Sequence, residues 1–503
     1  MKKLYTYLLL LSLGFPAVGQ NINDALRYGQ ENLSGTARFT ALSGAFGALG
    51  GDVSGFTINP AGSAIFLKNN ATFSLAVDHF SNTAALSNIQ EEVGNSDFII
   101  GNAGATFVFS NPNEESKWKK FTLGVAYHSQ NNFENELYTR GSSNATVGSF
   151  FTAQAAGVPL DLLQLLNGET IADLYSFLGE TEGTAAQNAF LGYQGYIIDP
   201  QGNSNNQYVS NTGSGSFAKD FAFISDGAQG KYTFNISSQY GDNLYFGINL
   251  NSHIIDYRQA TYLTEANSNN NSSVKRVNFD NSLNVIGSGF SAQLGIIGKI
   301  ENNLRLGFTY DTPTWYTITE ETTQYLNTSR VENGEDIFTE VAPRIINIYP
   351  DYRLTTPGKY SVSAAYIFGK DGLISFDYSM KDYGNLKFRP SNDPYFSSLN
   401  SVIENNLTAA STFRLGGEYR FKNVSLRGGG FIEGSPYKDD TIMSNREGFS
   451  LGLGYNFGDY FIDLAYARSQ QDSQRSYYSY GLVDTVSVEN VAQNFIVSFG
   501  LNL

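Results

Sequence analysis

The residue types that most often carry catalysis are scarce in this chain. Its three histidines, His79, His128 and His253, each lie on or near a different predicted strand. No serine or aspartate stands at a triad spacing from them, and no cluster has the spacing of metal ligands. The glycines within 44–50 lack the dinucleotide-binding spacing and the strand–helix unit around it. The sequence therefore predicts no enzyme, no metal and no cofactor; a hydrolase would need His128 paired with a serine or aspartate.

Charged side chains instead recur at alternate positions of short apolar segments. In 121–128, 304–311, 413–421 and 495–503, bulky apolar residues take every second place and small, polar or charged residues lie between them. A period of two predicts strands. One large aromatic face opposite a face with Arg and Asp is typical of a transmembrane β-barrel with its charges in the lumen. The charges predicted to face the lumen are Arg305, Asp311, Asp377, Arg414, Glu418, Arg420, Arg427, Asp463 and Arg468.

The spacing of these segments predicts how they connect. We expect about fourteen strands, an even number as single-chain barrels require. They fall at 71–80, 98–109, 121–133, 228–240, 244–257, 277–300, 304–320, 353–368, 372–388, 407–421, 424–433, 447–457, 460–474 and 488–503. Short turns (241–243, 301–303, 369–371, 422–423 and 458–459) alternate with long polar loops (81–97, 134–227, 258–276, 321–352, 389–406, 434–446 and 475–487). Tight turns on one rim and long loops on the other favour an all-β, closed antiparallel barrel over a soluble sandwich.

Composition indicates the class of protein and its compartment. The 503 residues are 41% hydrophobic and only 16% charged, with 51 Gly, no Cys and a net charge of −15. Low charge with many aromatic residues argues against a disordered chain, and the acidic balance argues against nucleic acid as a partner. Lys2 and Lys3, followed by the apolar run 4–15, predict a cleaved signal peptide at 1–19. We therefore expect export to a bacterial outer membrane, with membrane lipid around the barrel.

The segment before the first strand is rich in small side chains. Residues 35–62 consist largely of Gly, Ala and Ser, with one arginine and one aspartate. Such a segment has too little bulk for a core of its own but can pack its backbone closely against a wall. We predict that 20–68 form a hatch in the lumen of a barrel spanning 69–503. Ion pairs are expected to hold it, with a substrate-carboxylate site as the alternative; the expected hatch–barrel contacts are Arg38, Asp52, Arg305, Asp377, Arg414 and Glu418.

The loop 134–227 is too long to be a simple connection. It holds two apolar pieces, 159–166 and 171–178, with Pro159 as a start signal and Gly168 and Gly179 as stop signals. We predict two helices that offer a capture surface to an apolar ligand, pack together as a cap, or do both. The residues predicted for the capture surface are Leu162, Leu163, Leu166, Leu174 and Phe177.

Several of these segments carry a family resemblance. Residues 35–38 (GTAR), the small-residue run and the Asn-Pro-Ala of 59–61 together resemble the N-terminal hatch of the FadL/TodX outer-membrane transporters, and 304–316, 356–361 and 374–378 resemble that family too. The resemblance implies a monomeric barrel that takes up long-chain fatty acids or other hydrophobic molecules. Extracellular loops would capture the ligand, the hatch would move, and the ligand would leave sideways through the wall. The residues that carry over, as a gating motif, are Asn59, Pro60 and Ala61.

Two functions of different classes follow from the sequence. A hatch-gated, passive transporter predicts that Asn59→Ala alters uptake and leaves the barrel folded. A surface adhesin or structural barrel predicts instead that deleting 140–220 abolishes binding to external partners while the lumen stays closed.

Overall fold

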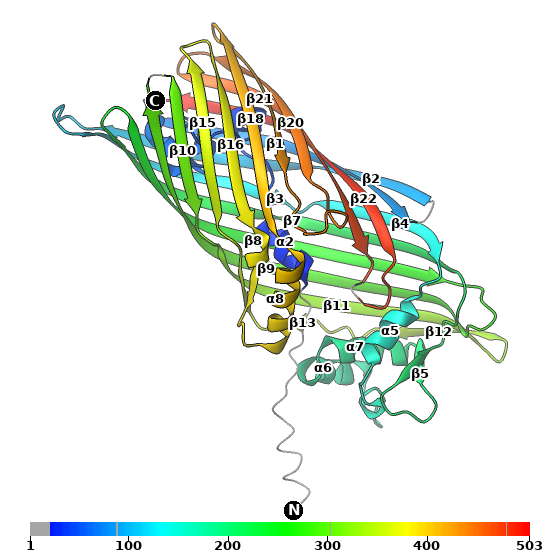
Figure 1. The fold of residues 1–503 in the computed structure, drawn as a ribbon. Helices are drawn as coiled ribbons and strands as arrows, with labels where there is room; N and C mark the ends of the chain where they lie inside the picture. The colour runs from blue at the N-terminus through cyan, green and yellow to red at the C-terminus, as the bar shows by residue number, and fades with distance from the viewer. Residues whose placement is uncertain (1–20, 87–88, 302, 479) are drawn as a thin grey trace, which may run out of the picture.

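The chain forms a closed antiparallel barrel (Figure 1). The computed structural model describes residues 21–86, 89–301, 303–478 and 480–503, and the predicted signal peptide lies outside them. A 14-strand ring closes because the last strand pairs back onto the first, which confirms the predicted fold class. The strands of the ring, in order, are β1 (Asn70–Leu86), β2 (Ile89–Ser110), β3 (Trp118–Asn132), β7 (Phe217–Tyr240), β8 (Leu244–Ala266), β9 (Val274–Ile300), β10 (Leu304–Asp311), β15 (Lys359–Phe368), β16 (Gly372–Asp382), β18 (Ala409–Phe421), β19 (Val424–Glu433), β20 (Arg446–Asn456), β21 (Tyr460–Ser476) and β22 (Thr485–Asn502).

The short turns predicted from the sequence all join neighbouring wall strands. They connect β7 to β8, β9 to β10, β15 to β16, β18 to β19 and β20 to β21. The C-terminus lies at the same rim (Figure 1). There the amide of Leu503 donates to the carbonyl of Asn69 at 2.9 Å, just before β1 begins. We call this end the turn rim and the opposite end the loop rim.

The predicted loop 81–97 is wrong. β1 and β2 pair continuously as far as Leu86 and Ile89, and β7, β8 and β9 also run beyond their predicted ends. The end of apolar alternation marks the edge of the membrane rather than the end of a strand. Ladder hydrogen bonds continue past it because they do not depend on the polarity of the side chains.

Three neighbouring wall strands are interrupted on their way to the loop rim, where the sequence predicts unbroken strands at 304–320, 353–368 and 372–388. Proline cannot donate to a ladder, and breaks occur at Pro313 and Pro357. The third break is the turn η3 (Tyr383–Asn385). Beyond the breaks the sheet resumes as β11 (Trp315–Glu332), β14 (Tyr352–Thr355) and β17 (Lys387–Arg389), extended by β12 (Glu335–Val341) and β13 (Asn347–Ile348).

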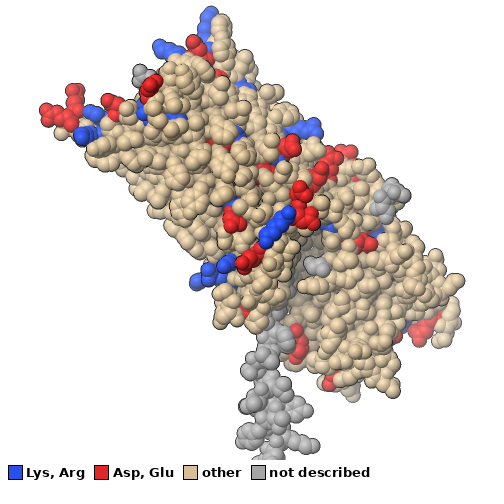
Figure 2. Space-filling model, viewed as in Figure 1, with Lys and Arg blue, Asp and Glu red and all other residues tan. Residues whose placement is uncertain are grey.

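Outward side chains form an apolar belt on the turn-rim half of the wall. Cross-strand neighbours share a face, so the exposed Phe73, Phe499 and Ile462 lie side by side on the outside. Figure 2 shows mostly uncharged wall between the charged side chains at the turn rim and those that cross the middle of the molecule. Exposed apolar side chains in a continuous belt suit the hydrocarbon of a bilayer.

The N-terminal segment lies inside the barrel in two parts. The arm, residues 21–34, contains α2 (Ile22–Gly29), which Asn21 and Asp24 cap reciprocally. The hatch, residues 35–65, contains only short helices: α3 (Ala37–Ala41), α4 (Val53–Phe56) and η1 (Pro60–Ile65). Nearly every hatch residue is buried.

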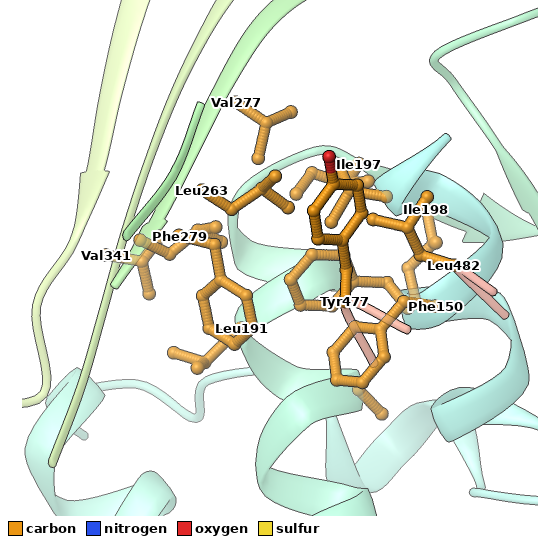
Figure 3. Close-up of a cluster of buried hydrophobic side chains, with 14 of the residues drawn as sticks. Phe150, Leu191, Ile197, Ile198, Leu263, Val277, Phe279, Val341, Tyr477 and Leu482 are labelled. Carbon is orange, nitrogen blue, oxygen red and sulfur yellow. The ribbon is translucent and has the colours of Figure 1, made fainter. Parts of the chain in front are cut away.

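A helical cap covers the loop rim between β4 (Asn135–Ser143) and β7. It comprises α5 (Val147–Ala155), α6 (Ile171–Thr181), α7 (Thr184–Gln194) and the hairpin of β5 (Ile198–Pro200) and β6 (Tyr208–Ser210). Its helices share one apolar core with the strand extensions, in which Phe150 and Leu191 lie near Phe279 and Tyr477 (Figure 3). Among the described residues, no helix is long and apolar enough to cross a membrane.

One of the two predicted cap helices forms. The helix expected at 171–178 is confirmed as α6 and continues past Gly179, because the missing side chain leaves room for Gln187 of α7. The helix expected at 159–166 is wrong: only the single turn η2 (Leu160–Leu162) forms. The amide of Leu160 donates to the carbonyl of Asn205 at 2.7 Å. This backbone hydrogen bond to a neighbouring loop takes the place of one within a helix.

Candidate functional site

Polar wall side chains bind the backbone of the hatch. Arg305 and Arg414 each donate to a hatch carbonyl, at 2.6 and 3.0 Å. The buried Asp377 carboxylate accepts from two successive hatch amides, at 3.0 and 2.8 Å. In the other direction, Arg38 of the hatch donates to the Glu418 carboxylate at 3.0 Å. These five predicted contact residues therefore do join the hatch to the wall.

Asp52, the sixth predicted contact, has a different role. Its carboxylate accepts from the amide of Ser54 at 2.8 Å and from the hydroxyl of Thr36 at 2.9 Å. In the part of the chain that the structure describes, its hydrogen bonds stay inside the hatch. The expectation of a wall contact is corrected: an aspartate just before a short helix is needed as its N-cap.

Glu418 is the centre of a buried ionic cluster at the turn-rim end of the hatch. Its side chain is 0% exposed and also binds Arg427 at 2.6 Å and Arg420. Arg427 continues to Asp463 at 2.6 Å. A carboxylate so enclosed by guanidinium groups stays ionised and fixes the hatch arginine in place.

One of the charges predicted to face the lumen points the other way. Arg468 of β21 pairs in register with Phe449 and Gln493 and is exposed on the outside of the wall. From Arg468 to Ser476, β21 carries polar side chains on both faces, so the sequence pattern there does not distinguish inside from outside.

The Asn-Pro-Ala motif ties the C-terminal part of the hatch to its middle and to β9. The fully buried Asn59 side chain donates to the carbonyls of Gly47, at 2.6 Å, and Ile296, at 3.2 Å. Its oxygen accepts from the amide of Ala61 at 3.1 Å, which caps η1. The carbonyl of Pro60 in turn accepts from Asn235 at 2.9 Å.

Wall glycines let the hatch backbone approach the strands directly. A Cβ on Gly295 would collide with Asn59 and Pro60, and one on Gly307 would collide with the carbonyl of Gly47. The same close approach recurs around the ring at Gly247, Gly416, Gly429 and Gly452. Small residues on both sides thus replace side-chain packing with backbone-to-backbone contact.

The arm is held differently. Its Ala25, Leu26 and Tyr28 are buried in a second apolar cluster with α8 (Pro394–Asn406) and aromatic side chains of the strand extensions. The guanidinium of Arg27 lies 4.1 Å from the centre of the Tyr257 ring. Residues 30–34, where the arm joins the hatch, are the longest run of the described N-terminal segment in which no residue is buried.

The ladder between β2 and β3 is incomplete. Their pairing stops at Asn102 and His128. From there towards the loop rim, one edge of β2 pairs with β1, and no described strand pairs with its other edge. β3 has an irregularity between Ser129 and Asn131. Side chains, not backbone, bridge the two edges there: Asn95 to Glu134 at 2.7 Å and Asn132 to Asp97 at 3.2 Å. We call this unpaired stretch the wall gap.

The wall gap begins inside the apolar belt. Phe98 and Ile100 of β2 face outward at this level and are 64% and 48% exposed. On the inner side, a cavity of about 90 Å³ is bordered by Ile99 of β2, by 129–134 and by the arm residues 32–34. A second cavity of about 90 Å³ shares the same arm residues and continues towards β7, β15 and β16. The connection between arm and hatch therefore stands between the lumen and the wall gap.

The histidines lie in polar surroundings. His79 is hydrogen-bonded to Ser96 at 2.9 Å. His253 is hydrogen-bonded to Gln130 and Ser291, both at 2.8 Å. His128 is buried, as expected for the lumen, and its Nδ1 has no partner within the described ranges. Among the described residues there is also no group of three or more potential ligands placed to hold a metal ion.

The residues predicted for a capture surface divide between core and surface. Leu163 and Leu174 are buried in the cap core, so these two do not face a ligand from outside, and the partly buried Leu162 packs against that core. Leu166 and Phe177 remain 72% and 48% exposed. The apolar residues of these two pieces mainly pack the cap together. This was the alternative to a capture surface in the sequence analysis.

Sequence reasoning overlooked three lysines that line the second cavity, Lys231, Lys359 and Lys381. The strand pattern could have located Lys231. It alternates with Tyr232 and Phe234, which face outward, so it falls on the lumen face. The wall gap had no comparable signal.

These features define a class: a transmembrane β-barrel with its own N-terminal segment in the lumen and, within the described residues, an unpaired stretch in its wall between β2 and β3. The sequence itself matches no protein-family model and no curated protein. Many solved structures share the fold, and two of them serve as examples. A Pseudomonas aeruginosa FadL homologue is similar over 94% of this chain and 99% of its own, with a TM-score of 0.55 and 12% identity. The toluene transporter TodX of P. putida is similar over the same shares, 94% and 99%, with a TM-score of 0.51 and 13% identity.

Proposed function

We propose that this protein is a bacterial outer-membrane channel for passive uptake of hydrophobic small molecules, long-chain fatty acids among them. Ligand is captured at the loop rim, enters the lumen beside the arm, and leaves sideways through the wall gap after part of the N-terminal segment moves. The apolar belt supports the location, and the FadL and TodX folds support the class of cargo. The protein acts as a monomer in this scheme, because one chain forms the whole pore.

The observation that carries the proposal is the wall gap. A hydrocarbon chain that continued straight to the turn rim would meet the ionic cluster of Glu418 and the hatch backbone. Burial of a CH₂ group is worth about 0.8 kcal/mol, so an apolar chain favours the route that never returns it to water. The wall gap opens within the apolar belt and offers that route into the bilayer.

A bulky residue at the inner border of the wall gap tests the route. Ile99→Trp fills the cavity that separates the arm from β2 and is expected to lower uptake of radiolabelled palmitate severalfold in a host that lacks its own transporter. Phe107→Trp is the matched control, because it changes an outward residue of β2 where pairing with β3 is complete. Unchanged palmitate uptake by a folded Ile99→Trp barrel would refute the lateral exit.

A second candidate, an adhesin, rests on the exposed Leu166 and Phe177 of the cap. The double variant Leu166→Ser/Phe177→Ser separates the two functions. Reduced palmitate uptake assigns these residues to ligand capture, whereas normal uptake with loss of cell attachment favours the adhesin.

A further inference from the structure

Basic side chains dominate the second cavity, which lies between the arm and strands β7, β15, β16 and β18. Lys231, Lys359, Lys381 and Arg414 line it, with the carboxylates of Glu31, Asp377 and Glu433. Glu31 is the only acidic residue of the arm segment 25–34 and reaches the cavity from the connection between arm and hatch.

Two of the three carboxylates are already engaged. Asp377 accepts from the hatch amides, and Glu433 binds Arg446 at 2.5 Å. Glu31 lies 3.4 Å from the ammonium group of Lys359, which also pairs with Asp311 at 3.0 Å. Glu31 is therefore the carboxylate left to balance the remaining cations.

Lys231 shows that the balance is incomplete. It is 6% exposed, and within the described residues no hydrogen bond or ion pair reaches its ammonium group. The nearby Lys381 and Arg414 donate to backbone carbonyls of the N-terminal segment, those of Gly29 and Ser43. The acidic charge that acts on it most is that of Glu31, which also faces Lys359 and Lys381. A mostly buried ammonium that shares one carboxylate with two other cations is costly, so this cavity favours an additional anion.

We propose that Glu31 occupies the place of a ligand carboxylate, and that a long-chain carboxylic acid binds by displacing Glu31 from Lys359 and engaging Lys231 and Lys381. This inference rests on the proposed function and names the chemical class of its ligand. Glu31 is suited to exchange because its side chain is 40% exposed to the cavity and its chain segment has no buried residue.

Displacement of Glu31 acts directly on the wall gap. The next residue, Asn32, donates its amide to the carbonyl of Gln130 at 3.0 Å, at the irregularity of β3. Arg446 binds both the carbonyl of Glu31 and the side chain of Asn32. Moving Glu31 therefore loosens the arm where it lines the wall gap. The two cavities share residues 32–34, so an acid held by its carboxylate can place its hydrocarbon chain at the opening.

Equilibrium binding of palmitic acid and hexadecanol to the purified full chain in a non-ionic detergent tests the proposal. The two probes share a chain and differ in charge. The wild type is expected to prefer the acid by about tenfold, the strength of a hydrogen bond to a charged group. Lys231→Met should abolish the preference without weakening hexadecanol. Glu31→Gln should tighten palmitate binding and leave hexadecanol unchanged. Lys275→Met, in the loop-rim part of β9, is the control and should behave as wild type.

The outcomes separate two failures. Equal wild-type affinity for acid and alcohol, or weaker palmitate binding by Glu31→Gln, overturns the carboxylate exchange and leaves the channel function standing. Absence of saturable binding for both probes overturns the proposed function. Lys231→Met removes an unpaired charge and so should fold; heat-modifiable migration in gels verifies this, and if it fails the Glu31→Gln result decides alone.

Discussion

The hatch and the arm belong to one continuous segment but are attached by different physics. The hatch is bound mainly through its backbone. Wall arginines and Asp377 hydrogen-bond to its carbonyls and amides, and glycines in the wall strands let its main chain come into direct contact with them. The arm is bound by side-chain packing around α2, in an apolar cluster, and by polar wall groups that contact the backbone of 29–32. Among the described residues, no wall strand approaches the arm at glycines in the way that the hatch is approached. The packing of the arm is the kind of contact that a ligand with an apolar chain and a carboxylate can replace.

This difference assigns two roles. Under the proposed function, the hatch is the fixed seal of the lumen and the arm is the movable part that a ligand replaces. We assign the Asn-Pro-Ala motif to the seal in this proposal, because Asn59 bonds both to the middle of the hatch at Gly47 and to the wall at Ile296.

Deletion separates the roles most strongly. Removal of 21–65 empties the lumen and should raise single-channel conductance in planar bilayers by roughly tenfold or more, since a barrel without a plug is a water-filled pore. Removal of 21–34 alone should leave conductance low, because the hatch stays in place. Equal conductance of the two deletions would contradict the division.

The buried ionic cluster gives the next largest effect. Glu418→Gln leaves Arg38 and Arg427 without their shared counter-ion and should cost about 3–5 kcal/mol in urea unfolding from lipid vesicles. The control is Arg140→Gln, which breaks the ion pair with Asp220 on the exposed outside of the cap region and should change stability little. A Glu418→Gln barrel as stable as wild type would show that the cluster does not hold the hatch.

Two glycines of β9 test the close approach on a smaller scale. Gly295→Ala forces the hatch away from the wall at Asn59 and should destabilise the protein by about 1–3 kcal/mol, the cost of overpacking. A Cβ at Gly298 meets only a Leu244 methyl group at 3.8 Å, so Gly298→Ala should be nearly neutral. The same urea titration compares them, and equal stabilities would argue against a tightly seated hatch.

The fold could be predicted from the sequence because lipid imposes a strict period. Segments such as 304–311 must alternate where one face meets hydrocarbon and the other the lumen. Outside the membrane that constraint ends, so 81–97 was expected to be a loop although β1 and β2 stay paired through it. The cap was harder, because a short apolar piece such as 159–166 can be helix or irregular core.

The site was only partly predictable. Inward charges such as Asp377 follow from alternation, and five of the six proposed hatch contacts meet the hatch. Which lumen-facing charges of the wall stay without a partner depends on the path of the arm through the lumen. The unpaired state of Lys231 and the incomplete pairing of β2 are properties of that path and of strand register, and no local pattern encodes them.

Two engineered disulfides in this cysteine-free chain test the central claim most directly. The hydroxyls of Ser43 and Ser450 lie 2.7 Å apart, so Ser43→Cys/Ser450→Cys locks the hatch to β20. Asn32→Cys/Asn131→Cys locks the arm to β3, where the amide of Asn32 donates to the Asn131 side chain at 3.1 Å. The measurement is palmitate uptake by oxidised and reduced cells. If the arm moves and the hatch stays, oxidation leaves uptake intact in the hatch-locked variant and abolishes it in the arm-locked variant, with recovery on reduction. Loss of uptake on locking the hatch, or normal uptake with the arm locked, would contradict it.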